Sequence, residues 1–538
     1  MNKFFKGVVC VLIVFSSTTV FSQSKEFKTA KSLDIQLSIL RELSLYYVDS
    51  VQVDKLVNIG IDAMLESLDP YTVYVPEEDE EGLEFMTTGS YGGVGALIRK
   101  VKSGIIISEQ YEGSPAARAG LVAGDTIIKI DSVFTENMKV EDCSAKMKGK
   151  PGTTVTFLVK KLRGGAPVEY KITREKIHFP DVAYYGVVKD SVGYIRISGF
   201  TLGGAKDVRK ALLELKSTGK LKRMIIDLRG NGGGLLDEAV EIVSLFVPKG
   251  TKIVSSKGRF KQADIDYITK DEPVDTSIPL AVLVNSGSAS SSEIVAGALQ
   301  DLDRATIIGV RTFGKGLVQS IRDVGYNSRI KLTTAKYYTP SGRCVQAIDY
   351  SHRNPDGSVG NVPDSLKKAF KTSKGRVVYD GGGIAPDIKA ESATYSRPAV
   401  SLVYNEVMHE FSMLYFKKHD KIESPSKFVL SEKDYEEFIN FAAEKEFDHR
   451  TSSEVEYDQL IATAKKEGLY DDLKAEIEKL EKLVKLGKKD VLRKNAKEIK
   501  YLLEEEICNR YYFQRGRVES MLRNDPQLDV AVKTKLVN

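Results

Sequence analysis

The spacing of hydrophobic positions changes along the chain, and each spacing predicts a different kind of structure. Residues 24–87 carry apolar side chains at helical intervals, whereas residues 88–175 carry short apolar runs separated by Gly and Pro, which is typical of strands. The helical positions are Leu33, Leu37, Leu40, Leu56, Ile59, Ala63 and Met64, and the apolar runs are 105–107, 126–130 and 155–159. We therefore predict a small N-terminal helical domain followed by a compact β-rich domain.

Apolar strands and amphipathic helices alternate over residues 176–397, which indicates an α/β core. The expected strands are 194–197, 224–227 and 280–284, and the expected helices lie near 204–216 and 235–246. A chain of 538 residues also exceeds the roughly 250–300 residues that one hydrophobic core organises. The fold class that we predict is therefore a multidomain α/β protein.

Beyond residue 397 the chain becomes helical in pattern and rich in Lys and Glu. Leu473, Ile477, Leu480 and Val484 recur at helical spacing, and Gly487 breaks the pattern before a further helix that should start at Asp490. We predict a helical C-terminal extension over 398–538. Its charged faces are either simply solvated or border a surface for homo-oligomerisation, and the sequence leaves both readings open.

The first 23 residues have the layout of a secretory signal peptide. Lys3 and Lys6 precede an apolar run from Val8 to Phe15, and small polar residues follow. The run is shorter than the ~20 residues of a membrane-spanning helix. We expect residues 1–23 to be removed and the protein to be exported to the periplasm, with a membrane-associated form as the alternative.

Charge and cysteine content argue against several functions. The 79 Lys and Arg are interleaved with 74 Asp and Glu, without the basic block of a nucleic-acid-binding tail. Cys143, Cys344 and Cys508 are too few and too widely spaced for a disulfide framework, although two of them could pair. Metal-ligand spacings such as CxxC or HExxH are absent, and Gly316 replaces the Ser or Thr that a phosphate-binding loop needs after its lysine. We predict no nucleic-acid partner, no metal and no cofactor.

A serine stands where a buried strand turns into a helix. Small residues follow the strand 280–284 up to Ser290, and an apolar helical face begins directly afterwards. The partial positive charge and unpaired N–H groups of a helix start favour an alkoxide or a tetrahedral oxyanion. Ser290 is therefore a candidate nucleophile, although Ser290-x-x-Glu293 is also the pattern of a capping box that would only start the helix.

A nucleophilic serine needs a base, and histidine is an unpromising choice here. The core contains only His178 at its edge and His352 in a polar stretch, so a Ser-His-Asp triad is poorly supported. Lys315 lies in a segment with little charge, where desolvation would lower the pKa of its amine enough to accept the serine proton. Gln319 could hold that amine without adding a negative charge. The predicted catalytic set is Ser290, Lys315 and Gln319.

A run of glycines over residues 230–234 follows the strand that ends at Asp227. Backbone amides in such a turn can approach a substrate carbonyl without steric hindrance. We predict an oxyanion hole in which Gly232 or Gly233 donates together with the amide of Ser291.

The β-rich domain resembles a PDZ domain. The resemblance rests on Gly113-Ser114-Pro115-Ala116, Ala119-Gly120-Leu121 and Gly124-Asp125-Thr126-Ile127. PDZ domains add a bound peptide as an extra strand and hold its terminal carboxylate with backbone amides. The resemblance implies a carboxylate-binding loop at Gly92, Gly93, Val94 and Gly95. The alternative is that these glycines serve only as a turn.

Taken together, the ordered motifs resemble those of the C-terminal processing peptidases, the tail-specific serine proteases of family S41 that carry a PDZ domain. Besides the PDZ elements, the matching motifs are 67–71, 227–234, 288–293, 312–319, 338–342 and 382–387. The resemblance implies an α/β core of the crotonase or ClpP type, an inserted PDZ domain, and an endopeptidase that cleaves the C-terminal tails of exported proteins.

In that family the serine three positions before the glutamate is the nucleophile, which here selects Ser290 over Ser288, Ser291 and Ser292. The lysine base falls on Lys315 and its supporting glutamine on Gln319. One departure is Ser291, where the family motif usually has alanine. Two alternatives remain: a non-catalytic PDZ scaffold that binds peptides, and an acyl-group enzyme of the enoyl-CoA hydratase type, which would have no use for a PDZ domain.

Overall fold

The computed structural model describes residues 25–101, 104–189 and 191–536. The predicted signal peptide, residues 1–23, lies outside this range. The chain divides into two compact units with the boundary between Tyr74 and Val75. Within the described residues, no helix is both long enough and apolar enough to cross a lipid bilayer.

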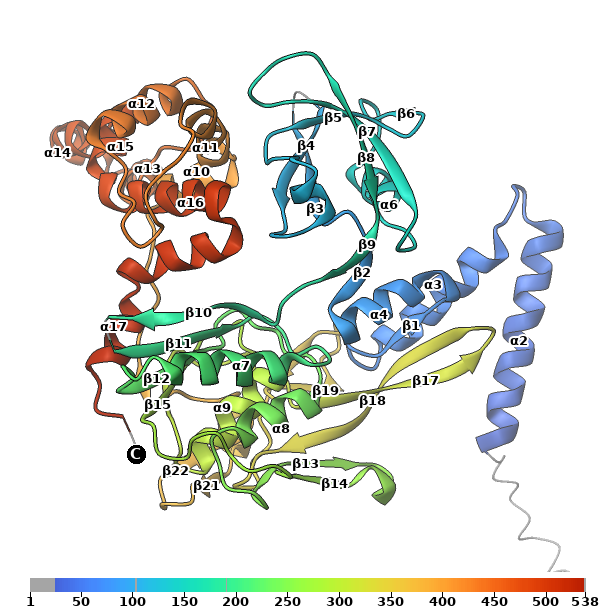
Figure 1. Cartoon of the computed structure of the whole chain (residues 1–538). Helices are drawn as coiled ribbons and strands as arrows, with labels where there is room; N and C mark the ends of the chain where they lie inside the picture. The colour runs from blue at the N-terminus through green and yellow to red at the C-terminus, as the bar shows by residue number, and fades with distance from the viewer. Residues whose placement is uncertain (1–24, 102–103, 190, 537–538) are drawn as a thin grey trace, which may run out of the picture. The chain divides into compact units, whose positions relative to one another are not determined.

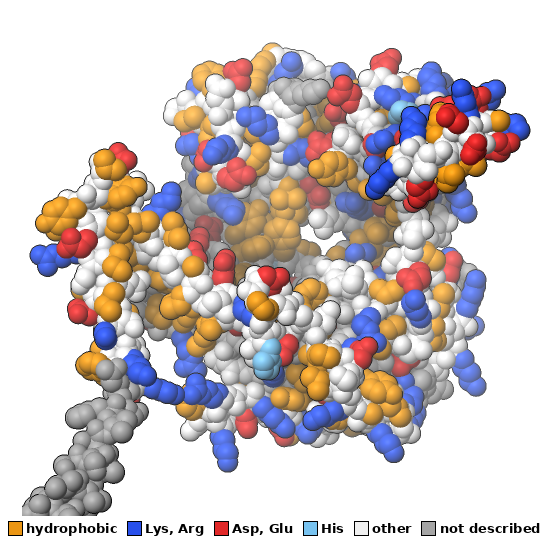
Figure 2. Space-filling view, turned by 180° about the vertical axis from the view of Figure 1, so that it is seen from behind, with side chains coloured by type: hydrophobic (Ala, Val, Ile, Leu, Met, Phe, Trp, Pro, Cys, Tyr) orange, Lys and Arg blue, Asp and Glu red, His pale blue; other side chains and the backbone are white. Residues whose placement is uncertain are grey.

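The first unit contains two helices, α2 (Lys25–Tyr46) and α3 (Val53–Glu66), which confirms the helical prediction for this stretch. Helix α2 buries none of its residues, and its apolar positions Leu33, Leu37 and Ile39 are exposed. In Figure 2 the hydrophobic side chains of these helices are open to view. The apolar spacing in α2 therefore correctly predicted a helix but not a buried face.

The β-rich module predicted over 88–175 is a sheet in the order β3-β4-β5-β7-β8, with β6 beside β5 (Figure 1). Its strands are β3 (Ala96–Val101), β4 (Gly104–Gln110), β5 (Thr126–Ile130), β6 (Val133–Phe134), β7 (Thr154–Lys160) and β8 (Val168–Thr173). Helix α6 (Val140–Met147) packs on this sheet, and α5 (Pro115–Arg118) starts at Ser114, whose hydroxyl caps it. Strand β3 lies at the edge, so one side of its backbone is available for another strand.

The α/β core predicted from residue 176 onward is built on a six-stranded sheet in the order β10-β11-β12-β15-β16-β23. Its strands are β10 (Val182–Val188), β11 (Val192–Ile197), β12 (Arg223–Asp227), β15 (Leu280–Val284), β16 (Thr306–Gly309) and β23 (Ile388–Lys389). All neighbours are parallel except β10, which is antiparallel to β11. Parallel sheets are normally covered on both faces, which explains why these strands read as continuous apolar runs.

Alternate residues of the core strands enter two different clusters. Ile226 and Val282 pack with α7 (Gly204–Ser217), α8 (Leu236–Ser244) and α9 (Ser291–Asp301) on one face. Ile225 and Leu283 pack on the other face with Leu528 and Ala531 of α17 (Pro526–Lys533), far away in the sequence. The last helix of the C-terminal extension thus packs on one face of the sheet in the α/β core.

A second sheet contains the strand that carries Gln319. Its strands include β13 (Lys252–Gly258), β14 (Ile265–Ile268), β17 (Leu317–Gly325) and β18 (Ser328–Tyr338). Strands β17 and β18 form a long antiparallel hairpin, with Gln319 opposite Thr333 and Ile321 opposite Lys331. Two short pairs follow, β19 (Ile348–Arg353) with β20 (Val359–Asn361) and β21 (Ala369–Lys371) with β22 (Val377–Tyr379).

The C-terminal extension is helical, as predicted. Its helices are α10 (Arg397–Tyr404), α11 (Val407–Lys418), α12 (Glu432–Ala443), α13 (Ser452–Glu467), α14 (Tyr470–Val484), α15 (Lys488–Lys494), α16 (Ala496–Met521) and α17. Helix α15 begins two residues before the predicted start at Asp490. Cys143, Cys344 and Cys508 are all free thiols in the described chain.

Candidate active site

Ser290 sits in a strained turn between β15 and α9. Its backbone has φ 56° and ψ −115°, a region that non-glycine residues rarely occupy. Holding a residue there costs on the order of 1–3 kcal/mol, and such strain gathers at active sites. A sharp strand-to-helix turn of this kind presents a serine hydroxyl at the top of the sheet, next to the amides that start the helix.

The three neighbouring serines have their hydroxyls committed to backbone carbonyls. Ser288 donates to Leu228 at 2.8 Å, Ser291 to Gly234 at 2.9 Å, and Ser292 to Asn231 at 2.9 Å. All three are at most 1% exposed, whereas Ser290 is only partly buried. The neighbours therefore tie the serine turn to the glycine turn, and Ser290 is the member of the group best placed to attack a substrate.

Asn231 and Gly233 bring the glycine turn into contact with the serine turn. The Asn231 side chain accepts the Gly233 N–H at 2.8 Å and donates to the carbonyl of Ile197 at 2.9 Å, while its backbone oxygen accepts the Ala289 N–H at 3.0 Å. A side chain on Gly233, where φ is 100°, would meet the Ser290 Cβ at 2.7 Å, whereas Gly232 faces open space. Since the Gly233 N–H is already bonded to Asn231, Gly232 and Ser291 are the better candidates for oxyanion donors in the predicted set.

Lys315 and Gln319 lie on the loop and strand that face this turn. The Lys315 amine donates to the Gln319 side-chain oxygen at 2.9 Å, and the Gln319 amide nitrogen donates to the Thr333 hydroxyl at 3.1 Å. Because the amide nitrogen is held by Thr333, the amide oxygen points to the lysine. This is the pairing expected from the sequence, with an acceptor that carries no negative charge.

Glu293 joins the serine turn to the lysine loop. One of its carboxylate oxygens accepts the backbone N–H groups of Ser290 at 3.0 Å and Lys315 at 2.8 Å. The other accepts the Thr312 hydroxyl at 2.6 Å and the Gly314 N–H at 2.8 Å. Burial raises the pKa of Glu293 to about 7, although these four donors favour the charged form. The glutamate half of the capping box is therefore formed, and it also fixes the segment that carries Lys315.

These elements surround one pocket of about 380 Å³. All six predicted catalytic and oxyanion residues line it, namely Ser290, Ser291, Lys315, Gln319, Gly232 and Gly233. The rest of the wall is mainly apolar and comes from α4 (Glu80–Thr88), the start of α8, α9 and the β17–β18 hairpin. Neither His178 nor His352 lines this pocket, in keeping with the choice of lysine as the base.

The predicted carboxylate-binding loop is shorter than the sequence indicated. Gly92 and Gly93 lie in strand β2 (Ser90–Gly93), which pairs with β9 (Glu175–His178), so only Val94 and Gly95 connect β2 to the edge strand β3. Gly95 has φ 74°, and a side chain on it would meet the Ser114 Cβ at 2.4 Å. A glycine is therefore required at this turn, directly before the free edge.

Comparison with known proteins identifies the parts of the chain. Residues 191–357 match the model of Peptidase family S41, residues 106–161 match a PDZ domain, and residues 399–534 match the "Probable PDZ-protease, C-terminal helical domain". The carboxy-terminal-processing protease of Bartonella bacilliformis is 38% identical over 347 residues, which cover 63% of this chain and 79% of the relative. The chain belongs to the carboxy-terminal-processing proteases of family S41. It is a serine-type peptidase.

A second relative, a CtpA-like serine protease of Staphylococcus aureus, is 36% identical over 313 residues, 57% of this chain. The chain spans 61% of the length of that relative. The solved photosystem II D1 C-terminal processing protease is 26% identical, covers 66% of this chain and 92% of its own, and has a TM-score of 0.36. By the matched family models, this chain combines an S41 peptidase domain with a PDZ domain and a helical C-terminal domain.

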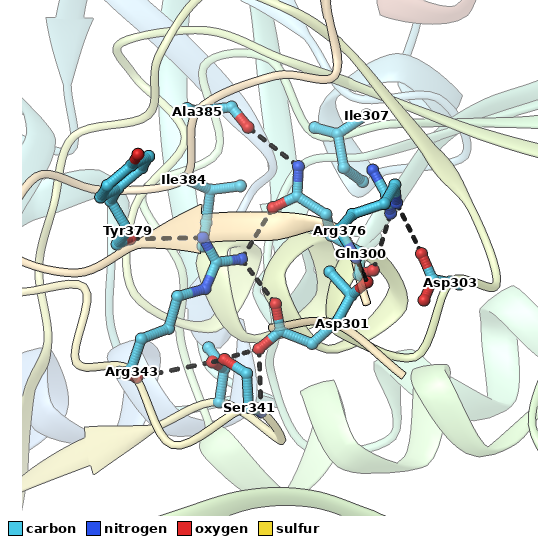
Figure 3. Close-up of polar contacts among 12 residues, drawn as sticks. Gln300, Asp301, Asp303, Ile307, Ser341, Arg343, Arg376, Tyr379, Ile384 and Ala385 are labelled. Carbon is cyan, nitrogen blue, oxygen red and sulfur yellow. Dashed lines mark hydrogen bonds and ion pairs between the residues drawn. The ribbon is translucent and has the colours of Figure 1, made fainter. Parts of the chain in front are cut away.

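A buried network of ion pairs and hydrogen bonds lies at the far end of helix α9 and includes residues from segments 338–342 and 382–387 (Figure 3). Arg343, whose side chain is 1% exposed, donates to Asp301 at 2.7 Å and to Gln300 at 2.7 Å. Asp301 also accepts the Ser341 N–H at 3.1 Å. Gln300 donates to the carbonyl of Ala385 at 2.9 Å. These contacts anchor the C-terminal end of the helix that follows Ser290, so Ser341 and Ala385 have a structural role.

Helix α17 contacts the glycine turn through Arg229. The Arg229 guanidinium pairs with Asp227 at 2.7 Å and with Asp525 at 2.5 Å, and it donates to the Gln527 side chain at 2.9 Å. Arg229 directly precedes Gly230, the first residue of the turn. The C-terminal domain of this protease therefore reaches the segment that carries the predicted oxyanion donors.

Sequence reasoning missed the roles of Glu293, Asn231 and Arg229. Glu293 was assigned only to helix capping, yet an acidic residue that is 0% exposed in an apolar helix needs several donors. Asn231 offered a similar signal, as a polar residue inside a run of glycines. No local signal pointed to Arg229, because its partner Asp525 lies almost 300 positions away.

Proposed function

We propose that this protein is an endopeptidase that cleaves the C-terminal tails of exported proteins with a Ser290–Lys315 dyad. The observation that carries the proposal is the shared pocket, in which the strained Ser290 turn faces Lys315 and the Lys315 amine is held by Gln319. A serine at a helix start and an amine oriented by a neutral acceptor are the two groups that acyl transfer requires.

In the proposed reaction the neutral Lys315 amine takes the proton from the Ser290 hydroxyl, and the serine oxygen attacks the peptide carbonyl carbon. The carbonyl oxygen becomes an oxyanion, which the amides of Ser291 and Gly232 would stabilise. Lys315 then gives the proton to the leaving amine as the peptide bond breaks. Water, deprotonated by the same amine, hydrolyses the acyl-enzyme and regenerates Ser290.

The PDZ domain would supply the substrate. A tail added to the free edge of β3 would pair with its backbone, and its carboxylate would face the turn at Val94 and Gly95. We also propose that the core is of the crotonase or ClpP type. The signal peptide would be removed, and the mature protein would act in the periplasm. Self-association through the C-terminal helices is a further part, and the exposed Leu473, Leu480 and Leu483 on α14 support it.

The non-catalytic scaffold is less well supported as a function. A serine that only capped a helix would not need a backbone in a strained conformation, nor a lysine held by a glutamine in the same pocket. Its prediction is clear, however, since a scaffold binds tails without cleaving them.

The proposal is tested by incubating the purified protein with unfolded substrates that differ only in their last residues, in parallel with Ser290→Ala. We expect cleavage by the wild type and none by the variant, while both bind the tails equally. A matched Ser291→Ala variant, which returns the position to the usual family residue, should remain active. Cleavage that survives in Ser290→Ala would contradict the proposed nucleophile, and tail binding without cleavage by the wild type would favour the scaffold.

A further inference from the structure

The catalytic pocket carries positive charge that the proposed mechanism does not use. Among the described residues that line it, the only amines are those of Lys315, the proposed base, and Lys331, and no Asp or Glu is present. The carboxylate of Glu293 is buried behind the wall and already accepts four hydrogen bonds. Lys331 therefore needs an explanation of its own.

Lys331 lies on strand β18 of the β17–β18 hairpin, which also carries the residues that hold the Lys315 amine. Its strand partner is Ile321, and the next pair on the same face is Gln319 with Thr333, since residues two apart on a strand share a face. The Gln319–Thr333 pair holds the Lys315 amine. The Lys331 pair is thus the next one along this face of the hairpin after the Gln319–Thr333 pair, and Lys331 lines the same pocket as Lys315.

The amine of Lys331 has no ion-pair or hydrogen-bond partner within the described part of the chain, although the side chain is partly buried. The strand partner Ile321 is apolar, and so are Leu83 and Met86 in the wall of the same pocket. Burial lowers the pKa of Lys331. A cation in such surroundings is poorly solvated, and an arriving anion would stabilise it more than at an open surface.

We propose that Lys331 is a specificity residue that favours substrates with an Asp or Glu side chain close to the scissile bond. The inference rests on the proposed peptidase function and names a substrate class for that same pocket. The apolar wall would accept the neighbouring apolar side chains of the substrate, and the acidic side chain would supply the missing counter-charge. The terminal carboxylate of the tail is a second source of negative charge, but the PDZ edge strand is expected to hold it.

The test uses peptides that contain one mapped cleavage site and differ at a single position, with Glu, Gln or Lys placed in turn at each of three positions on either side of the bond. We expect the wild type to prefer Glu over Gln by about tenfold in kcat/KM at one position, which corresponds to about 1.4 kcal/mol. Lys331→Met should abolish this preference, and Lys331→Glu should reverse it in favour of Lys. The control Lys336→Met, on the same strand but exposed and outside the pocket, should keep it.

Equal cleavage of the Glu and Gln peptides by the wild type, or a preference that survives in Lys331→Met, would overturn the inference. A preference that disappears when the peptide C-terminus is amidated would also overturn it, because the terminal carboxylate would then be the group recognised. Cleavage by Ser290→Ala would instead show that the proposed function itself is wrong, so the two failures can be told apart.

Discussion

The Lys315 amine donates a hydrogen bond to the Gln319 side-chain oxygen at 2.9 Å. An amide oxygen can orient an amine without stabilising its charged form, whereas a carboxylate at the same place would hold the proton on the lysine. Thr333 fixes the direction of the amide by accepting from its nitrogen at 3.1 Å. This arrangement suits a lysine that must be neutral when it accepts the serine proton.

The substitution Gln319→Glu should therefore move activity to higher pH. The new carboxylate would raise the pKa of Lys315, so that less of the amine is neutral at pH 7–8, and we expect kcat/KM there to fall by about tenfold or more. Activity should recover as the pH is raised. Gln319→Ala serves as the control, since it loses orientation without adding charge and should lower the rate without an alkaline shift. An unchanged pH profile for Gln319→Glu would count against Lys315 as the base.

The two central glycines should respond differently to substitution. In Gly233→Ala the added methyl group would collide with the Ser290 Cβ at 2.7 Å and with backbone atoms of the serine turn, and the backbone there has φ 100°. We expect a loss of at least about 100-fold in kcat, which is the size of effect seen when an oxyanion donor is lost. Gly232→Ala meets no atom within 4 Å and should retain most of the activity. Steady-state kinetics of the two variants would decide, and equal effects would refute this steric account.

Glu293 should link stability to pH. Its pKa is near 4.5 in an unfolded chain and about 7 in the folded protein, where burial raises it. Because the folded state binds the proton more tightly, the contribution of Glu293 to the free energy of unfolding falls as the pH rises from about 4.5 to about 7, and changes little above that range. The Tm advantage of the wild type over Glu293→Gln should accordingly be larger at pH 5 than at pH 8. A difference in Tm that does not change between these pH values would contradict the prediction.

The same variant should be impaired in catalysis at every pH. Each oxygen of Glu293 accepts two hydrogen bonds, so the NH₂ group of a glutamine would face two donors in either orientation. Buried donors left unpaired cost about 1–3 kcal/mol, and we expect kcat to fall by about tenfold or more as the Ser290 and Lys315 segments separate. Single-turnover kinetics would measure this loss, and wild-type kcat in Glu293→Gln would exclude a positioning role.

The contact between Asp525 and Arg229 predicts that the C-terminal helix supports catalysis. Asp525→Asn keeps a side-chain oxygen for the N–H groups of Gln527 and Leu528 at the start of α17, but removes the charge that faces Arg229. We expect a lower Tm and a reduced kcat with little change in KM, since the glycine turn would be less well held. The matched control is Asp529→Asn on the same helix, which affects only an exposed ion pair with Lys189. Equal behaviour of the two variants would argue against this support.

Local patterns were sufficient for most elements of the core. The predicted strands 126–130 and 280–284 coincide with β5 and β15, and the helix predicted near 204–216 is α7. Each of these segments has an apolar pattern of one period bounded by clear breaks, so neighbouring residues alone determine its type. Ser290, Lys315 and Gln319 could be predicted as site residues for a similar reason, because the short motifs that surround them are distinctive.

What the sequence did not predict depends on contacts between distant segments. Leu528 and Ala531 pack on the core sheet, which their sequence pattern does not predict. An amphipathic pattern indicates that one face of a helix is buried, but not which element covers it. Only the structure shows that the hydroxyls of Ser288, Ser291 and Ser292 donate hydrogen bonds to backbone carbonyls of a distant segment. Lys331 gave no signal at all, since its importance comes from the pocket wall that the hairpin forms.

The central claim is that Ser290 becomes acylated with the help of Lys315. The most direct measurement is the reaction of the purified protein with a fluorophosphonate, which labels activated serines, followed by peptide mapping of the modified residue. We predict label on Ser290 in the wild type, no label in Ser290→Ala, and labelling slowed by at least about 100-fold in Lys315→Ala at neutral pH. Label on Ser288, Ser291 or Ser292, or wild-type labelling rates in Lys315→Ala, would contradict the dyad.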